Sequence, residues 1–212
     1  MEPRPAVSDT LSPVSPISAS PPEDLRHFPE RILAPGEPLF RIYRADRGPW
    51  WFSSDGTGRF DLSPPRGTCY LAEDPLGAFV ETFREAHVVP EQAVRRRVQS
   101  RLALPRALRL ADCADRKARM FGVTAAVHAT PDYALTGAWA SGLAGAGFDG
   151  VRYLLSHDPA QELVGYALFG DAGEAGDPAA WPPTEPTEPG EIAADVLVRA
   201  RRQFGFLIVP AR

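Results

Sequence analysis

The stretch that decides the fold is residues 50–83, WWFSSDGTGRFDLSPPRGTCYLAEDPLGAFVETF. Its residues 68–72, TCYLA, begin with a β-branched side chain and include an aromatic one, a composition typical of a short strand. Asp74 then precedes Pro75, and the apolar residues that follow recur at helical spacing. This pattern predicts a helix that begins at Pro75 with Asp74 as its N-cap. A turn-rich segment, residues 62–67, leads into the strand.

Three side chains of this stretch form a candidate site: Arg59 in a glycine-flanked loop, Tyr70 on the strand and Glu81 on the helix. Glu81 follows Val80 at the edge of the apolar stripe, where a carboxylate needs a partner or a function. The residues alone leave two interpretations open. In one they are a solvated arginine, a half-buried tyrosine and a structurally paired carboxylate; in the other they act together on a ligand.

Composition and charge restrict the class of protein. The chain has 212 residues, 44% of them hydrophobic, which suits a domain of ordinary size with its own core. A net charge of −4 gives no basic footprint for nucleic acid. Because there is no apolar run of membrane-spanning length and no secretory pattern at the N-terminus, we expect a cytoplasmic protein that does not enter a membrane. Cys69 and Cys113 lack the spacing of a disulfide framework or a metal site, and we expect them reduced and partly buried.

The chain divides into a tail and one domain. Residues 1–24 are rich in proline and serine and predict a flexible tail or a docked extended arm. Residues 25–212 are expected to form a single domain. In it, strands are predicted at 37–44, 68–72, 107–112, 148–155, 162–169 and 206–209, and helices at 75–83, 115–122, 133–146 and 191–203. Residues 90–104 are expected to form an arginine-rich, solvated connector that contains a short strand or helix, and residues 170–189 an acidic Pro/Gly loop. Because strands and helices do not alternate strictly, the fold class is α+β.

The alternation of residues 37–44 places Arg41 and Tyr43 on one face of their strand. Arg41 is therefore a candidate cation inside a cleft, or an arginine at the rim of an edge strand. The sequence has no P-loop, no GxGxxG after a strand and no HExxH. The four histidines are scattered, and no metal is expected.

Five short blocks occur in an order that resembles the RES domain family. They are LFR at 39–41, GRF at 58–60, GTCYLA at 67–72, AFVE at 78–81 and GVRYLLS at 150–156. The family is named for arginine, glutamate and serine positions and includes the toxins of bacterial Xre–RES toxin–antitoxin pairs. The resemblance implies a fold similar to ADP-ribosyltransferases, a mixed α+β structure with a split β-sheet, flanking helices and NAD⁺ in the cleft.

The resemblance also implies roles for six residues. Arg41 and Arg59 would hold the diphosphate of NAD⁺, and Tyr70 would stack on or flank the nicotinamide. Glu81 would bind the nicotinamide ribose and stabilise the positive charge that develops as the glycosidic bond breaks. The remaining two would bind NAD⁺: Tyr43, which stands one residue after the place where some relatives carry an aromatic residue, and Ser156, which would also take part in catalysis. Ser156 lies one residue beyond the family spacing, and on a strand that offset reverses the face unless a bulge intervenes.

The activity implied is that of a toxin that consumes NAD⁺ as a substrate and is neutralised by a cognate antitoxin of the Xre type. The acceptor of the ADP-ribose is left open: water gives a glycohydrolase, phosphate a phosphorylase and a protein side chain a mono-ADP-ribosyltransferase. A degenerate, non-catalytic nucleotide-binding module is the alternative from a different class. Whether copies of the chain form a homo-oligomer is likewise open.

Overall fold

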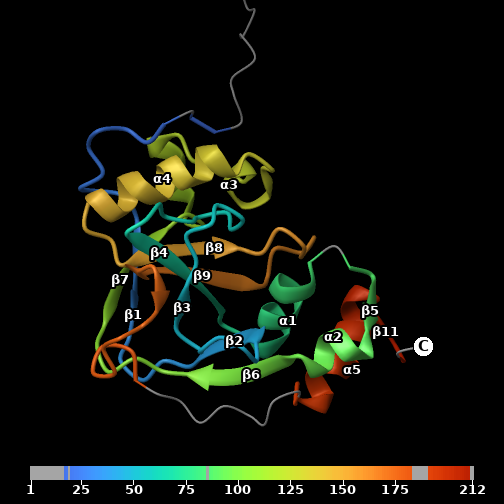
Figure 1. Ribbon diagram of the computed structural model, residues 1–212. Helices are drawn as coiled ribbons and strands as arrows, with labels where there is room; N and C mark the ends of the chain where they lie inside the picture. Colours follow the sequence, from blue (N-terminus) through green and yellow to red (C-terminus); the bar gives the residue numbers. More distant parts are fainter. Residues whose placement is uncertain (1–16, 19, 85, 183–190, 211–212) are drawn as a thin grey trace, which may run out of the picture.

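The computed structural model describes residues 17–18, 20–84, 86–182 and 191–210 (Figure 1). Its main feature is a seven-stranded sheet with the order β1-β7-β8-β9-β4-β2-β6. The strands are β1 (Glu30–Leu33), β2 (Leu39–Arg44), β4 (Arg66–Ala72), β6 (Arg97–Leu102), β7 (Leu108–Asp112), β8 (Gly150–Leu154) and β9 (Val164–Asp171). The pair β7 and β8 is parallel and every other neighbouring pair is antiparallel, so the sheet is mixed.

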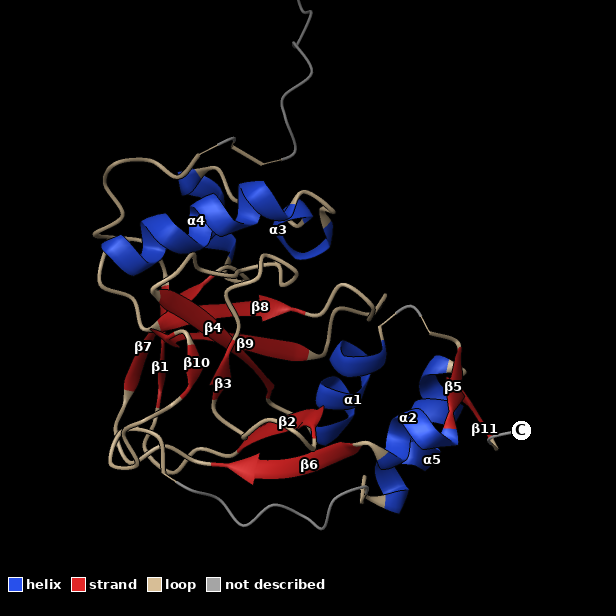
Figure 2. Cartoon of the chain, viewed as in Figure 1, coloured by secondary structure: helices blue, strands red, loops and turns tan. Residues whose placement is uncertain are grey.

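Two short ladders and two groups of helices complete the fold. The ladders are β3 (Trp51–Phe52) with β10 (Gly173–Glu174), and β5 (Val88–Pro90) with β11 (Leu207–Val209). The helices are α1 (Pro75–Phe83), α2 (Glu91–Arg95), the 3₁₀ helix η1 (Arg116–Phe121), α3 (Ala126–Ala129), α4 (Tyr133–Gly145) and α5 (Ala194–Phe204). Figure 2 shows α3 and α4 on one side of the sheet and α1, α2 and α5 grouped beside β2 and β6. The mixed sheet with flanking helices confirms the predicted α+β class.

The sheet is split between β4 and β2. Strand β4 pairs with β9 at every position from Arg66 to Ala72, and β2 pairs with β6 along its whole length. The two ladders meet at a single pair, Phe40 opposite Ala72. Beyond that pair the side chain of Arg41 lies between the two strands, and its Nη1 donates to the Cys69 Sγ of β4 at 3.0 Å. The split sheet implied by the sequence is thus present.

Helix α1 begins where the sequence predicts. The Asp74 carboxylate accepts the Leu76 N–H at 2.6 Å and caps the first turn, which contains Pro75. The buried face of α1 packs on β2 and on the C-terminal segment; for example, the rings of Phe79 and Phe206 meet edge to face at 5.2 Å. This packing fixes the orientation of α1 and therefore the direction of the side chains on its opposite edge.

Helix α4 also follows its prediction, with Asp132 accepting the Leu135 N–H at 3.0 Å. Trp139 is fully buried on this helix, and its Nε1 donates to the Ser18 carbonyl at 3.0 Å. Ile17 is buried beside it. The end of the proline-rich segment therefore docks on α4, while residues 1–16 and 19 of the predicted tail lie outside the described residues.

Two segments expected to be largely irregular contain regular elements. The arginine-rich connector at 90–104, expected to contain a short strand or helix, contains both α2 and β6, and β6 is the edge strand of the main sheet. Arginines on an edge strand discourage pairing with other chains, so the composition that suggested a connector is that of a protected edge. The loop expected at 170–189 includes the end of β9 and β10, and residues 183–190 lie outside the described residues.

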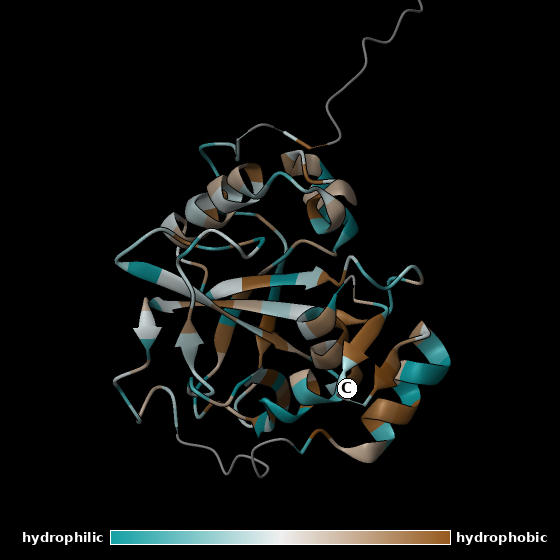
Figure 3. Ribbon diagram, turned by 45° about the vertical axis from the view of Figure 1, so that its right-hand side comes forward, coloured by the Kyte–Doolittle hydropathy of each residue, from teal (hydrophilic) through white to brown (hydrophobic). Residues whose placement is uncertain are grey.

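The second short ladder lies near the C-terminus and exposes apolar side chains. In Figure 3 the paired strands β5 and β11, beside the label of the C-terminus, are coloured as hydrophobic. Val88, Leu207 and Val209 in this ladder are exposed. In the parts of the chain that the structure describes, none of the helices has the length and apolar character needed to cross a lipid bilayer.

Candidate functional site

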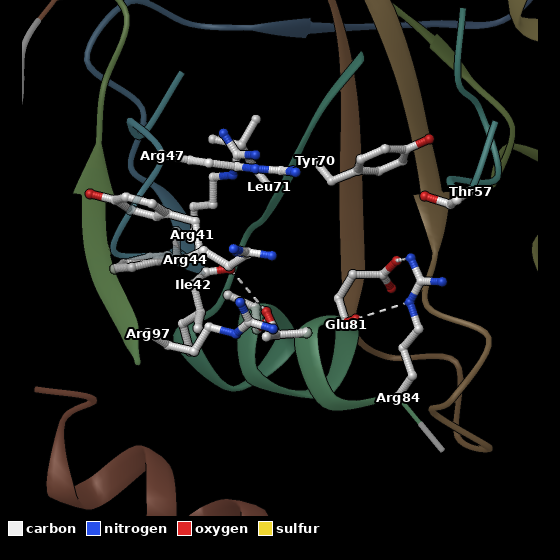
Figure 4. Close-up of a pocket in the computed structure, with 14 residues that line it drawn as sticks. Arg41, Ile42, Arg44, Arg47, Thr57, Tyr70, Leu71, Glu81, Arg84 and Arg97 are labelled. Atoms are coloured by element: carbon white, nitrogen blue, oxygen red, sulfur yellow. Dashed lines mark hydrogen bonds and ion pairs between the residues drawn. The ribbon is translucent and has the colours of Figure 1, made fainter. Parts of the chain in front are cut away.

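A cavity of about 370 Å³ lies at the split of the sheet. Strand β2 and helix α1 supply most of its wall, and β4, β6 and the loops before and after β3 supply the rest (Figure 4). Of the six residues singled out in the sequence, Arg41, Tyr43, Tyr70 and Glu81 line this cavity. Residues far apart in the sequence thus share one space.

Glu81 points from α1 into the cavity and faces Arg84 (Figure 4). Its side chain is only 21% exposed, and its Oε1 lies 3.7 Å from Nη2 of Arg84. Burial raises the pKa of the Glu81 carboxyl above its ordinary value, and the positive charges of Arg84, His157 and Arg59 oppose that shift. The carboxylate at the edge of the apolar stripe is therefore half-buried and lies among cations.

Tyr70 contributes its ring to the cavity, while its hydroxyl is bonded on the far side. The hydroxyl donates to Asp61 Oδ1 at 2.8 Å and accepts the Phe60 N–H at 2.9 Å. Burial, reinforced by the charge of Asp61, raises the pKa of Tyr70 well above its ordinary value. Tyr70 therefore keeps its proton and ties the loop before β4 to the sheet.

Asp61 is a residue of this site that the sequence reasoning missed. It is buried, and burial raises its pKa although Tyr70 and the Gly58 N–H both donate to its carboxylate. A Cβ at Gly58 would lie 2.4 Å from Asp61 Oδ1 and from the Tyr70 hydroxyl, so only glycine fits there. No local pattern marked Asp61, because its burial depends on Tyr70, nine positions along the chain.

Arg59 and Ser156 come together beside the cavity rather than in its lining. The Arg59 guanidinium donates to the Thr130 carbonyl, stacks 5.2 Å from the centre of the Tyr133 ring, and has Nη2 3.5 Å from Ser156 Oγ. Its main-chain carbonyl accepts the Thr136 hydroxyl. Arg59 is thus held on several sides, close enough for its charge to act on Glu81.

Ser156 lies in the turn that follows β8, because that strand ends at Leu154. The alternation of side chains along a strand therefore does not decide which way Ser156 points. The one-residue offset noted in the sequence does not turn Ser156 away from Arg59. Before it on β8, Tyr153 is fully buried and its hydroxyl has no hydrogen-bond partner among the described residues. Burial, with the charge of Glu81 next in importance, raises the pKa of Tyr153 well above its ordinary value.

Arg41 lines the cavity, and its guanidinium also bonds to the protein. It donates to the carbonyls of Pro49 and Trp51, the latter at 3.0 Å, as well as to Cys69. Tyr43 shares its face, as the alternation predicts, with the guanidinium carbon 5.8 Å from the ring centre. The interpretation of Arg41 as a cation in a cleft agrees with its place in the cavity lining, although three of its hydrogen bonds are structural.

Four further arginines line the cavity, and the sequence reasoning missed their part in it: Arg44, Arg47, Arg84 and Arg97. Glu81 is the only carboxylate among the described residues of the lining. The described residues contain no group of three or more histidine, cysteine, aspartate or glutamate side chains arranged to hold a metal ion. The site is therefore a cationic cleft around one carboxylate, which suits an anionic ligand with a cationic centre.

Comparison with known proteins places the chain in a family. The family model of the RES domain matches residues 38–189, well over half of the chain. This chain belongs to the RES domain family. The match spans the blocks that carry Arg41, Arg59, Tyr70, Glu81 and Ser156, and so it includes the whole cleft of this RES domain.

A solved structure supports the same fold. This RES domain resembles a chain in the crystal structure of the M. tuberculosis MbcT–MbcA toxin–antitoxin complex, with a TM-score of 0.52 and 18% sequence identity. The likeness covers 65% of this chain and 76% of that chain. At such low identity it speaks for the fold. A comparison with curated protein sequences gave no match.

Proposed function

We propose that this RES domain protein is a toxin that degrades NAD⁺ by cleaving the bond between nicotinamide and its ribose. The observation that carries the proposal is the single cavity in which a half-buried carboxylate, an aromatic wall and several guanidinium groups meet. NAD⁺ offers the complement of each: a ribose joined to a cationic ring, a flat aromatic surface and a diphosphate.

Glu81 is the residue we assign to bond cleavage. As the glycosidic C–N bond breaks, its electron pair stays with the nicotinamide nitrogen, so the leaving group departs neutral and needs no proton. The ribose then carries a developing positive charge, which a nearby carboxylate stabilises. Arg84, His157 and Arg59 favour the ionised form of Glu81 in a site where burial opposes it. Water or phosphate attacks the anomeric carbon and gives up a proton.

The other residues bind and orient the substrate in this proposal. Tyr70 offers its ring to the nicotinamide, since its hydroxyl is committed to Asp61. Arg41 and Arg59 bind the diphosphate with their remaining N–H donors and their positive charge. Tyr43 and Ser156 lie at the two ends of the binding site. Each of these positions lies in the cavity or directly beside it.

We further propose that a cognate antitoxin covers the cleft. The family includes toxins of Xre–RES pairs, and the structural neighbour is a chain from a toxin–antitoxin complex. A cationic cleft with one carboxylate offers such a partner a charged surface to block. The antitoxin of this protein is expected to be of the Xre type.

The test is nicotinamide release from NAD⁺ by the purified protein, with and without phosphate. Glu81→Gln is expected to slow release by roughly 100-fold or more, a loss of about 3 kcal/mol of transition-state stabilisation. The matched control is Glu162→Gln, which removes an exposed carboxylate outside the cavity and leaves the rate unchanged.

Two results would count against the assignment. Release of nicotinamide by Glu81→Gln at the wild-type rate removes Glu81 from the mechanism. No release by the wild-type protein, freed of any antitoxin, favours the non-catalytic binding module instead. With NAD⁺ labelled in its adenosine half, label in free ADP-ribose or its phosphate indicates small acceptors, and label on a macromolecule indicates protein ADP-ribosylation.

A further inference from the structure

The far end of the cavity carries positive charge that the fold does not balance. The register of β2 and β6 places Arg44 directly opposite Arg97. Like charges opposite each other in an antiparallel ladder are destabilising. Arg47 follows in the next turn, with its guanidinium 4.8 Å from the centre of the Trp51 ring. The nearby acid is Asp46, and its carboxylate is already bound by Arg44 at 2.8 Å.

Arg97 is the best marker of a missing ligand. Its Nε is buried and has no hydrogen-bond partner among the described residues. A buried N–H without an acceptor costs about 1–3 kcal/mol, so native proteins seldom retain one without a reason. Burial, followed by the charge of Arg44, lowers the pKa of Arg97. An anion at this place would relieve both the unpaired donor and the repulsion.

These arginines also stand between two cavities. Arg44 and Arg97 line both the cavity of Glu81 and an adjoining one of about 580 Å³. Arg95 and Arg96 line the second cavity, where Asp46 is the single acid among the described lining residues. Figure 4 shows Arg44 and Arg97 across the cavity from Glu81. A group bound by them lies away from the bond that Glu81 is assigned to cleave.

We propose that Arg44, Arg47 and Arg97 form a phosphate subsite that accepts a dianionic phosphoryl group in addition to the diphosphate of the dinucleotide. Planar guanidinium groups bind phosphate oxygens through paired N–H donors, and the three positive charges less the negative charge of Asp46 equal in size the charge of a phosphate monoester dianion. Because the subsite lies away from Glu81, the group it fits best is a phosphate on the adenosine ribose of the substrate. This inference rests on the proposed function, whose site it extends.

The experiment is calorimetric titration of the full-length protein with three ligands that need no cleavage: ADP-ribose, 2′-phospho-ADP-ribose and inorganic phosphate. For the wild-type protein we expect the 2′-phosphorylated ligand to bind roughly 10- to 100-fold more tightly than ADP-ribose, the range for hydrogen bonds to a charged group. Arg97→Gln is expected to abolish that difference and to leave the affinity for ADP-ribose within about 2-fold.

The matched control is Arg101→Gln, because Arg101 is exposed on the same strand and lines neither cavity. It removes the same charge and is expected to keep the wild-type preference. If inorganic phosphate binds the wild-type protein and loses affinity in Arg97→Gln while the two nucleotides bind alike, the subsite takes free phosphate. If Arg97→Gln and Arg101→Gln bind all three ligands as the wild-type protein does, the subsite is refuted.

Folding is checked by the thermal midpoint without ligand. Arg97→Gln is expected to unfold at or above the wild-type temperature, because it removes the repulsion across the β2–β6 ladder. These readouts do not depend on turnover. Failure of the subsite therefore leaves nicotinamide release intact, and failure of NAD⁺ cleavage leaves the phosphate preference measurable.

Discussion

Replacing Tyr70 by phenylalanine separates the two parts of this side chain. The ring that lines the cavity is kept, and the hydroxyl that joins β4 to the preceding loop is lost. Two groups then lose their partner inside the protein: the Phe60 N–H and the carboxylate of Asp61, which is 8% exposed. The variant thus tests whether the loop that carries Arg59 is held by that hydroxyl.

The magnitude follows from these two hydrogen bonds. A hydrogen bond to a charged group contributes about 1.5–3 kcal/mol, and a buried N–H left unpaired costs about 1–3 kcal/mol. Asp61 keeps the Gly58 N–H at 3.0 Å, which limits the loss. The middles of those ranges sum to about 4 kcal/mol, and with the Gly58 bond retained we expect Tyr70→Phe to lower the free energy of unfolding by about 3–4 kcal/mol.

The assay is urea unfolding at pH 7, with Tyr166→Phe as the matched control. Tyr166 lies on the neighbouring strand and is 1% exposed, but its hydroxyl reaches Glu73 only at 3.5 Å. Its loss is expected to cost under about 1 kcal/mol. Since the Tyr70 hydroxyl is assigned no proton transfer, the folded variant should release nicotinamide within about 10-fold of the wild-type rate. A Tyr70→Phe protein as stable as the control would refute the anchoring role.

Three further predictions concern buried groups. Burial lowers the pKa of His128 to about 4, so on acidification the unfolded chain binds a proton at this position before the folded protein does. The free energy of unfolding therefore falls as pH drops from 6.5 towards 4. His128→Asn should remove up to about 3 kcal/mol of that pH dependence in urea unfolding. Gly58→Ala would bring a Cβ to 2.4 Å from Asp61 and should cost about 1–3 kcal/mol, whereas Gly145→Ala, with no atom within 4 Å, should be neutral or stabilising in the same assay. Burial raises the pKa of Glu81 in the folded protein above its ordinary value of 4.5, so the folded state binds that proton more tightly than the unfolded chain does. The free energy of unfolding therefore falls as pH rises from 4.5 through the raised pKa. Glu81→Gln should remove this pH dependence and melt at or above the wild-type temperature at pH 7.

The local parts of the fold could be predicted from the sequence. The start of α1 at Pro75 with Asp74 as cap, the end of α5 at Gly205 and the burial of Trp139 each depend on a few neighbouring residues. The same is true of the alternation that places Arg41 and Tyr43 on one face. For these features the local preference and the packed structure agree.

The arginine cluster could not be predicted in this way. Arg97 stands opposite Arg44 only because β6 pairs with β2, and a charge-rich segment gives no sign of which strand it will join. Asp61 escaped notice for a similar reason, since its burial depends on a tyrosine nine positions away on β4. Long-range register, which the pattern of a single segment does not encode, brought these residues to the site.

Three unfavourable features of the fold gather at the split of the sheet. Arg44 opposes Arg97, the Arg97 Nε is unpaired among the described residues, and the carboxyl of Glu81 has its pKa raised by burial. On the other side of the split, β4 and β9 pair without interruption. Exposed charges such as Arg101 protect the edge strand, so edge protection does not account for Arg97, whose Nε is buried. Conflicts of this kind are expected where a site is kept for its ligand, and all three face one cavity.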